Sequence, residues 1–206
     1  MPNEEVRIII NEYGAGTHWG SSHHGWHTGI REPSDRRPNE QKAKALADGI
    51  KSVMGVSELT VSKTDTVRQT VSGKELTYVI YQAQDAQKKD IGAAVESTTG
   101  GFGGDLKVLV GFDPEGKILG YTLLEHAETP GLGAKADKWF QKGEKGDIIG
   151  KSPVEPLTVS KDGGKVDAIT ASTITSRAFL LAVNNAYNAY KATPATDVKT
   201  GASEQY

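Results

Sequence analysis

The sequence predicts an α+β fold in which a mostly antiparallel sheet is packed with helices. Two observations predict it. Residues 107–112 and 118–124 alternate along the chain on either side of a turn at 113–116, which is typical of a β-hairpin. Residues 43–54 and 173–192 carry apolar side chains at helical spacing, which is typical of helices that bury one face.

The first half of the fold begins with a predicted helix that Asn39 caps and Gly55 ends, and that packs one face on the sheet. Residues 59–71 are rich in Thr and Val and alternate, so they predict one or two strands. A turn at 72–74 leads to a strand at 76–82, and a polar loop follows at 85–89.

The second half contains a predicted loop at 97–105, where four glycines surround Phe102 and let the backbone pass close to something, or merely turn the chain. This loop lacks the Gly-Lys-Ser/Thr ending of a nucleoside-triphosphate site. After the hairpin we expect a short helix, extended pieces and a short strand, at 136–140, 148–150, 156–159 and 165–167. The last helix starts at Thr173 and ends before Pro194. Its broad buried face combines a main stripe with adjacent residues: Phe179, Val183, Ala186 or Tyr187, and Tyr190, beside Ile174, Ala178 and Leu181.

Composition limits the function classes. The 206 residues suffice for one domain, and a net charge of −2 gives no electrostatic argument for nucleic acid. The absence of Cys excludes disulfides, thiolate nucleophiles and cysteine-held metal centres. No stretch approaches the ~18 apolar residues of a membrane helix. We expect an atypical N-terminal arm, or a segment added for expression, at 1–38, the folded domain at 39–192 and a flexible tail at 193–206.

Four of the five histidines, His18, His23, His24 and His27, lie within ten residues of each other in that arm. Neutral imidazoles bind zinc or copper, but the spacing fits no helical or zinc-finger pattern. A metal-binding module is therefore the weaker interpretation, and a loop or added segment is the stronger one.

The start of the last helix is the most informative stretch. Residues 167–176, Asp-Ala-Ile-Thr-Ala-Ser-Thr-Ile-Thr-Ser, combine small side chains with hydroxyls where a helix begins. Free backbone N–H groups and the helix dipole favour a phosphate at such a position. An ordinary N-cap is the competing interpretation, because Ser and Thr are preferred there in any case.

Three segments in this order resemble the FMN-binding domain of the G subunit of the Rnf electron-transport complex. They are Phe102-Gly103-Gly104-Asp105, His126 to Gly133 with its Glu-Thr-Pro-Gly-Leu-Gly run, and residues 167–176. The C subunit of the sodium-translocating NADH:quinone reductase is a more distant resemblance. The third family motif usually reads Ser/Thr-Gly-Ala-Thr, whereas this chain has Thr170-Ala171-Ser172-Thr173.

The resemblance implies FMN joined through a phosphoester to the hydroxyl of Thr173 and attached by a separate flavin transferase. It implies that the loop from Glu128 meets the flavin ring, with Glu128 tuning its potential. The implied cofactor-binding residues are Thr173, Glu128, Thr129, Pro130, Gly131, Leu132, Gly133, Asp167, Thr170, Ala171, Ser172 and Thr175.

The implied role is electron transfer in an ion-translocating ferredoxin:NAD oxidoreductase, together with the other membrane subunits of that complex. The resemblance places it on the extracytoplasmic face of a bacterial membrane, with the anchor absent from this chain and no independent catalytic activity. Two alternatives remain open beside the metal module: a flavoprotein that binds FMN without a covalent link, and a carrier like the C subunit of the sodium-translocating reductase.

Overall fold

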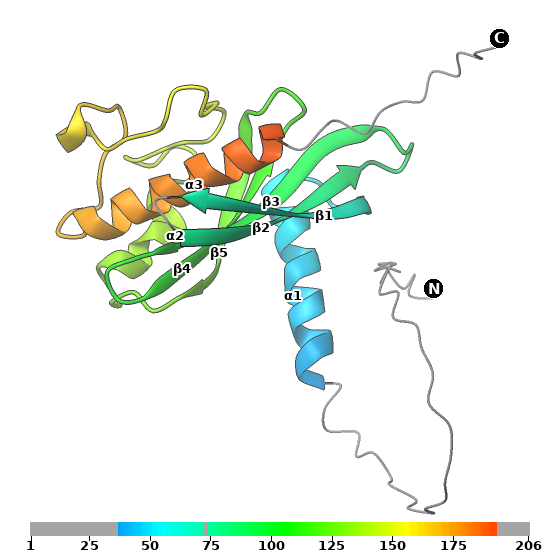
Figure 1. The fold of residues 1–206 in the computed structure, drawn as a ribbon, viewed down its shortest axis with the longest axis horizontal. Helices are drawn as coiled ribbons and strands as arrows, with labels where there is room; N and C mark the ends of the chain where they lie inside the picture. Colours follow the sequence, from blue (N-terminus) through cyan, green and yellow to red (C-terminus); the bar gives the residue numbers. More distant parts are fainter. Residues whose placement is uncertain (1–36, 72–73, 193–206) are drawn as a thin grey trace, which may run out of the picture. The chain divides into compact units, whose positions relative to one another are not determined.

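The computed structural model of the protein describes residues 37–71 and 74–192 (Figure 1). The chain divides between Asp48 and Gly49 into two units, and helix α1 (Arg37–Met54) crosses this boundary. The unit that begins at Gly49 contains the sheet, the helix α3 and the short helical turns between them. The predicted tail and most of the predicted arm lie outside the described residues, since only 37 and 38 of the arm belong to α1.

A five-stranded sheet forms the centre of this unit. Every neighbouring pair of strands is antiparallel, and the strands follow one another in chain order. The strands are β1 (Thr60–Val71), β2 (Lys74–Gln84), β3 (Asp90–Gly100), β4 (Asp105–Phe112) and β5 (Ile118–His126). The α+β prediction is therefore confirmed, as is the hairpin, whose turn is closed by a 2.9 Å hydrogen bond from Gly116 N to Asp113 O.

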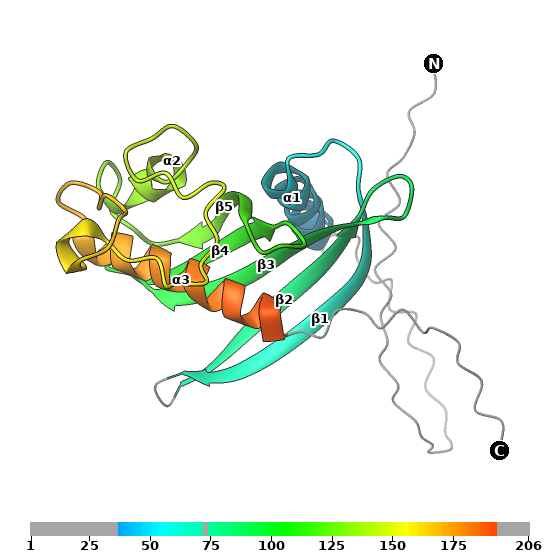
Figure 2. The same cartoon turned by 90° about the horizontal axis from the view of Figure 1, so that it is seen from above.

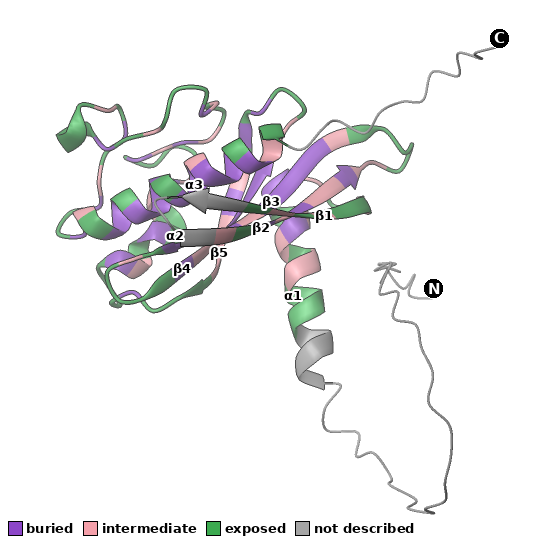
Figure 3. Cartoon of the chain, in the orientation of Figure 1, coloured by how far each residue is buried: buried purple, intermediate pink, exposed green. Residues whose placement is uncertain are grey.

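Helix α3 (Thr173–Ala192) covers one face of the sheet (Figure 2). Phe179 stacks on Phe140 at a centroid distance of 4.3 Å and meets the edge of Tyr121 at 4.7 Å. The main predicted stripe of α3 is buried or partly buried. Figure 3 shows buried and exposed positions along this helix. Ile174 and Leu181 were also expected in the buried face, but both are exposed, so the face is narrower than the sequence predicts.

The last turn of α1 packs against the opposite face. A Cβ atom at Gly111 or Gly120 would lie against the carbonyl oxygen of Val53, so these strand glycines admit the helix end. The next residue, Phe112, contacts Tyr187 of α3. Because successive strand residues point to opposite faces, the end of α1 and helix α3 lie on opposite faces of the sheet. Gly55 ends α1 with a positive φ of 67°, as predicted, but the Asn39 cap is wrong because α1 begins at Arg37.

Two expectations about irregular segments are wrong. Residues 97–100 belong to strand β3, which pairs with β4 up to Gly100 and Asp105, and the loop is limited to 101–104. The predicted strand at 165–167 is reduced to one isolated parallel bridge between Val159 and Val166. In the described part of the chain, no helix is both long and apolar enough to cross a membrane.

Candidate functional site

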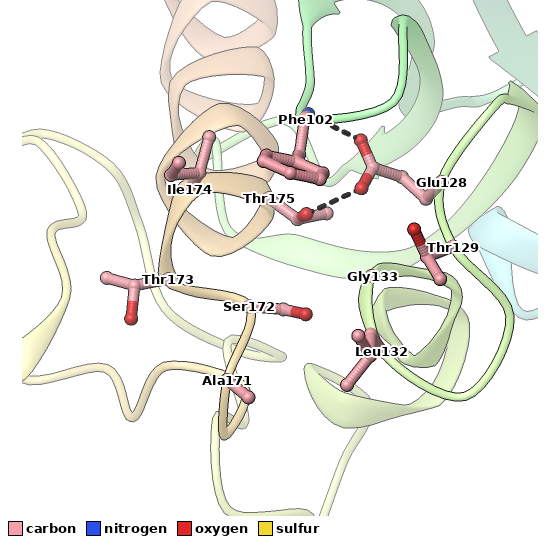
Figure 4. A pocket seen from close by; sticks show the side chains of 10 residues that line it. All are labelled: Phe102, Glu128, Thr129, Leu132, Gly133, Ala171, Ser172, Thr173, Ile174 and Thr175. Carbon is pink, nitrogen blue, oxygen red and sulfur yellow. Dashed lines mark hydrogen bonds between the residues drawn. The ribbon is translucent and has the colours of Figure 1, made fainter.

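Three segments that are far apart in the sequence enclose a cavity of about 380 Å³ beside the start of α3 (Figure 4). The first is the glycine loop after β3, the second is the loop after β5, and the third is the first turn of α3. The residues that line the cavity are Phe102, Glu128, Thr129, Leu132, Gly133, Ala171, Ser172, Thr173, Ile174 and Thr175.

Glu128 joins all three segments. Its side chain is only 5% exposed, and its Oε1 accepts hydrogen bonds from the backbone N of Phe102 at 2.7 Å and of Gly103 at 3.2 Å. Its Oε2 accepts from the hydroxyl of Thr175 at 2.6 Å (Figure 4). All three partners are donors, so both oxygens of the carboxyl group act as acceptors. Glu128 therefore fixes the position of the cavity walls relative to one another.

Glycines at 101 and 133 make room for this carboxylate. A Cβ atom at Gly101 would fall on Glu128 Oε1, and one at Gly133 would fall on Glu128 Oε2 and lie 2.8 Å from Thr175 Oγ1. Neither glycine is at a positive φ, so the requirement is space and not backbone conformation. In the Gly-Leu-Gly run after Pro130, it is therefore the second glycine, Gly133, that leaves space for the Glu128 carboxylate.

The chain that follows the loop is attached to the sheet by Tyr121. Its hydroxyl donates to the carbonyl of Ala136 at 2.6 Å and accepts from the N–H of Phe140 at 3.2 Å, which holds both ends of α2 (Ala136–Trp139). Burial raises the pKa of Tyr121, so the phenol stays protonated and remains a donor. The 128–133 loop is therefore held from behind as well as by Glu128.

The start of α3 presents donors to the cavity. The first helical hydrogen bond runs from Ser176 N to Ser172 O at 3.0 Å. The N–H groups of Thr173, Ile174 and Thr175 therefore have no acceptor within the helix. The Ser172 side chain is only 8% exposed and points into the cavity. No hydrogen bond of this hydroxyl is found among the described residues, so it is available to a group bound in the cavity.

The two candidate threonines differ in their surroundings. Thr175 is 1% exposed and is bonded to Glu128. Thr173 is half-buried, its side chain points away from Glu128 in Figure 4, and the Nζ of Lys161 lies 3.4 Å from its hydroxyl oxygen. Of these two threonines, Thr173 is the one whose hydroxyl is accessible without breaking a buried hydrogen bond.

Apolar side chains complete the cavity. Phe102 is 68% exposed, and Ile174 and Leu132 are also exposed although all three line the cavity. Large apolar side chains that stay exposed around a cavity mark a binding site. The combination of an apolar rim, free N–H groups and an unpartnered hydroxyl suits a flat aromatic ring with an anionic tail.

Eight of the twelve residues predicted for the site line the cavity: Glu128, Thr129, Leu132, Gly133, Ala171, Ser172, Thr173 and Thr175. Pro130, Gly131, Asp167 and Thr170 do not line it and are exposed. The carbonyl of Asp167 instead accepts a 2.8 Å hydrogen bond from the Trp139 indole. Phe102 lines the cavity, which agrees with one of the two interpretations left open for the glycine loop. Ile174 also lines it but was not predicted as a site residue; its position between Thr173 and Thr175 of the motif was the available signal.

The metal interpretation gains no support from the described residues, which contain no group of three or more His, Asp or Glu placed to hold an ion. His18, His23, His24 and His27 lie outside the part of the chain that the structure describes.

Comparison with known proteins defines the class first. The family profile for the FMN-binding domain matches residues 101–188, a range that includes all three cavity segments. Shewanella oneidensis NqrC shares the fold with a TM-score of 0.51 at 16% identity, over 75% of this chain and 100% of that chain. The C subunit of the Na(+)-translocating NADH-quinone reductase from Parabacteroides distasonis has a TM-score of 0.50 at 20% sequence identity. The match covers 80% of this chain and 96% of that chain. The chain contains an FMN-binding domain, and FMN is its cofactor.

The sequence relatives define the family. The G subunit of the ion-translocating oxidoreductase complex of Shewanella baltica is 33% identical over 156 residues, which is 73% of this chain and 73% of that protein. The G subunit of the same kind of complex from Haemophilus influenzae is 42% identical over 98 residues, 44% of this chain and 47% of that protein. The chain belongs to the family of G subunits of ion-translocating oxidoreductase complexes.

Proposed function

We propose that this protein is an electron-transfer subunit of an Rnf-type ion-translocating oxidoreductase complex, with FMN linked through a phosphoester to Thr173. The observation that carries the proposal is the contrast between two hydroxyls in one cavity. Thr175 is buried and engaged by Glu128, whereas Thr173 is accessible at the same helix start. Membership of the G-subunit family supports the assignment to such a complex.

The residues at the start of α3 would hold the phosphate. The hydroxyl of Ser172 points into the cavity, and the N–H groups of Thr173 to Thr175 have no intrahelical acceptor. The helix dipole favours an anion at this helix start by about 0.3–1 kcal/mol. Phe102, Leu132 and Ile174 would contact the ring. Bound FMN supplies the redox chemistry, and the chain supplies binding, orientation and local charge. Glu128 would hold the 128–133 loop in place, since its carboxylate oxygens accept hydrogen bonds from Phe102, Gly103 and Thr175.

The link requires an activated donor. We propose a flavin dinucleotide, in which the FMN phosphate is part of a phosphoanhydride. The Thr173 oxygen forms the new bond to phosphorus, the anhydride bond breaks, a nucleoside monophosphate leaves and the hydroxyl proton is released. A threonine hydroxyl needs a base for this step. Its one hydrogen-bond neighbour in the described part of the chain is Lys161, which donates, so a separate flavin transferase would supply the base.

The proposed setting is the extracytoplasmic face of a bacterial membrane, beside the other subunits of the complex. A covalent link suits this role because the cofactor cannot dissociate while electrons pass between fixed partners. The chain would act as a relay without a substrate reaction of its own.

Intact mass of the denatured protein tests the link. After coexpression with a flavin transferase, the wild-type chain should gain the mass of FMN less one water and keep its visible absorbance. Thr173→Ala should gain nothing, whereas folded Thr175→Ala should still gain the flavin mass. Visible flavin that separates from the wild-type chain on denaturation would instead favour a flavoprotein that binds FMN without a covalent link. Loss of the addition in Thr175→Ala alone would move the attachment site to Thr175.

A further inference from the structure

We propose that Lys161 is the cationic residue that binds the phosphate at Thr173, and that Asp162 and Arg177 position it there. The inference rests on the proposed function, because it concerns the group attached at Thr173. It adds a residue from a segment outside the three cavity segments and outside the cavity lining.

The geometry places an ammonium group beside the attachment oxygen. Lys161 lies in a short helical turn, η3 (Ser160–Asp162), and its Nζ is 3.4 Å from the Thr173 hydroxyl oxygen. This distance is longer than a strong N–H···O hydrogen bond. The ammonium is therefore close to the hydroxyl but remains available to a stronger acceptor, such as a phosphate oxygen.

The turn that carries Lys161 is fastened to α3 itself. Arg177 Nε is 2.7 Å from Asp162 Oδ2 and Arg177 Nη2 is 2.6 Å from Asp162 Oδ1, which is a bidentate pair. Arg177 is four residues after Thr173, so the two lie on the same face of the helix. The pair thus holds η3 over the helical turn that bears the attachment hydroxyl.

Charge on this side of the helix start favours an anion. The first turn of α3 contains no acidic side chain, and Glu128 is directed to Thr175 on the cavity side. Two carboxylates are near the turn: Asp162 is paired with Arg177, and Asp167 accepts from the Ser160 hydroxyl at 3.3 Å. Lys161 adds its charge to the positive end of the helix dipole, so the phosphate would be approached from two directions.

Arg177 has a different role from Lys161. Its guanidinium is occupied by Asp162, so it would act on the phosphate only through the position of Lys161. Replacing Arg177 should therefore weaken the effect of Lys161 and have little effect in a chain that already lacks Lys161. This non-additivity separates a positioning residue from a second phosphate ligand.

The first experiment measures the initial rate of flavin addition to purified chains by intact mass, with a flavin transferase and its flavin dinucleotide donor. Lys161→Gln should lower the rate about fivefold at low salt, and Lys161→Glu should lower it further. Lys161→Arg should stay near wild type. Lys165→Gln removes an exposed lysine from the neighbouring segment and should also stay near wild type. The difference between the two Gln variants should shrink at high salt.

The second measurement detects the contact itself. Lysines carrying ¹³C-dimethyl groups keep their charge, and the NMR signal lost in Lys161→Gln identifies Lys161. That signal should shift when the wild-type chain becomes loaded with FMN, whereas the signal of Lys165 should not. Equal rates for Lys161→Gln and Lys165→Gln, or an unmoved Lys161 signal, would overturn the inference while leaving the link to Thr173 standing. A wild-type chain that gains no mass overturns the proposed function and this inference with it.

Discussion

The hydroxyl of Thr175 donates a 2.6 Å hydrogen bond to the carboxylate of Glu128, 47 residues earlier in the chain. Because Glu128 also accepts from the N–H groups of Phe102 and Gly103, one buried side chain connects the glycine loop, the loop after β5 and the start of α3. The bond also separates the roles of two threonines. Thr175 is engaged by Glu128, and Thr173 is the residue that the proposed function assigns to the cofactor.

Thr175→Val should lower the free energy of unfolding by about 1–3 kcal/mol, because Glu128 Oε2 would stay buried without its donor. Thr173→Val should change the free energy of unfolding by no more than about 0.5 kcal/mol, since its hydroxyl is half-buried and makes one long contact. Urea denaturation of the chain without flavin measures both. A Thr173 variant as unstable as the Thr175 variant would contradict this division of roles.

The glycine before the Phe102 loop offers a second test of the same carboxylate. Gly101→Ala places a methyl group on Glu128 Oε1 and 3.0 Å from the carbonyl oxygen of Gly104, so it should destabilise the domain by about 1–3 kcal/mol. Gly100→Ala is the matched control. Nothing lies within 4 Å of its Cβ position, and its effect should stay within about 0.5 kcal/mol. Equal urea midpoints for the two variants would show that Glu128 is not packed against Gly101.

Much of this site could be predicted from the sequence, because the motifs are local. Glu128 to Gly133 and Ala171 to Thr175 stand out by residue type and spacing, and each segment contributes to the cavity. The hairpin and α3 could also be predicted, since turn residues and helical periodicity are recognised from residues close together in the sequence.

The rest depends on contacts between distant segments. No strand was predicted at β3: residues 90–96 were left unassigned and 97–100 were placed in a loop. The strand is rich in small residues, and its buried run at 92–95 shows no alternation. Phe102 belongs to the cavity through the bond from its N–H to Glu128, 26 residues later. Lys161 reaches Thr173 through the Asp162–Arg177 pair, which no spacing in the sequence indicates.

Ala171 has a φ of 61°, in the left-handed region that non-glycine residues rarely adopt. Ala171→Gly should therefore raise the free energy of unfolding by about 0.5–1 kcal/mol, because relief of the strain exceeds the added flexibility of the unfolded chain. Lys88→Gly is the comparison, since Lys88 also has a φ of 61° but lies in a turn outside the cavity.

Both glycine variants should gain stability in urea denaturation. In the flavin-addition assay, only Ala171→Gly should change the rate, because Ala171 adjoins the N–H groups that would receive the phosphate. A loss of stability in Ala171→Gly would mean that its methyl group contributes more by contact than its backbone conformation costs.

The Asp162–Arg177 pair should be visible in the titration of a single carboxyl group. Hydrogen bonding to Arg177, aided by its charge, holds the pKa of Asp162 below its usual value. Because the folded pKa is the lower one, the pair stabilises the folded chain above the unfolded pKa of about 3.9, and this stabilisation is lost as the pH falls through the folded pKa. Carboxyl ¹³C NMR should show the Asp162 midpoint below about 3.9 in the wild-type chain and near that value in Arg177→Gln.

The same titration connects the pair to the attachment site. As Asp162 becomes protonated, η3 should loosen from α3, and the dimethyl-lysine signal of Lys161 should move with the same midpoint. In Arg177→Gln the Lys161 signal should start in its loosened position at neutral pH. An Asp162 midpoint that does not change in Arg177→Gln would show that the pair is not maintained in solution, and Lys161 would then lack the support that places it beside Thr173.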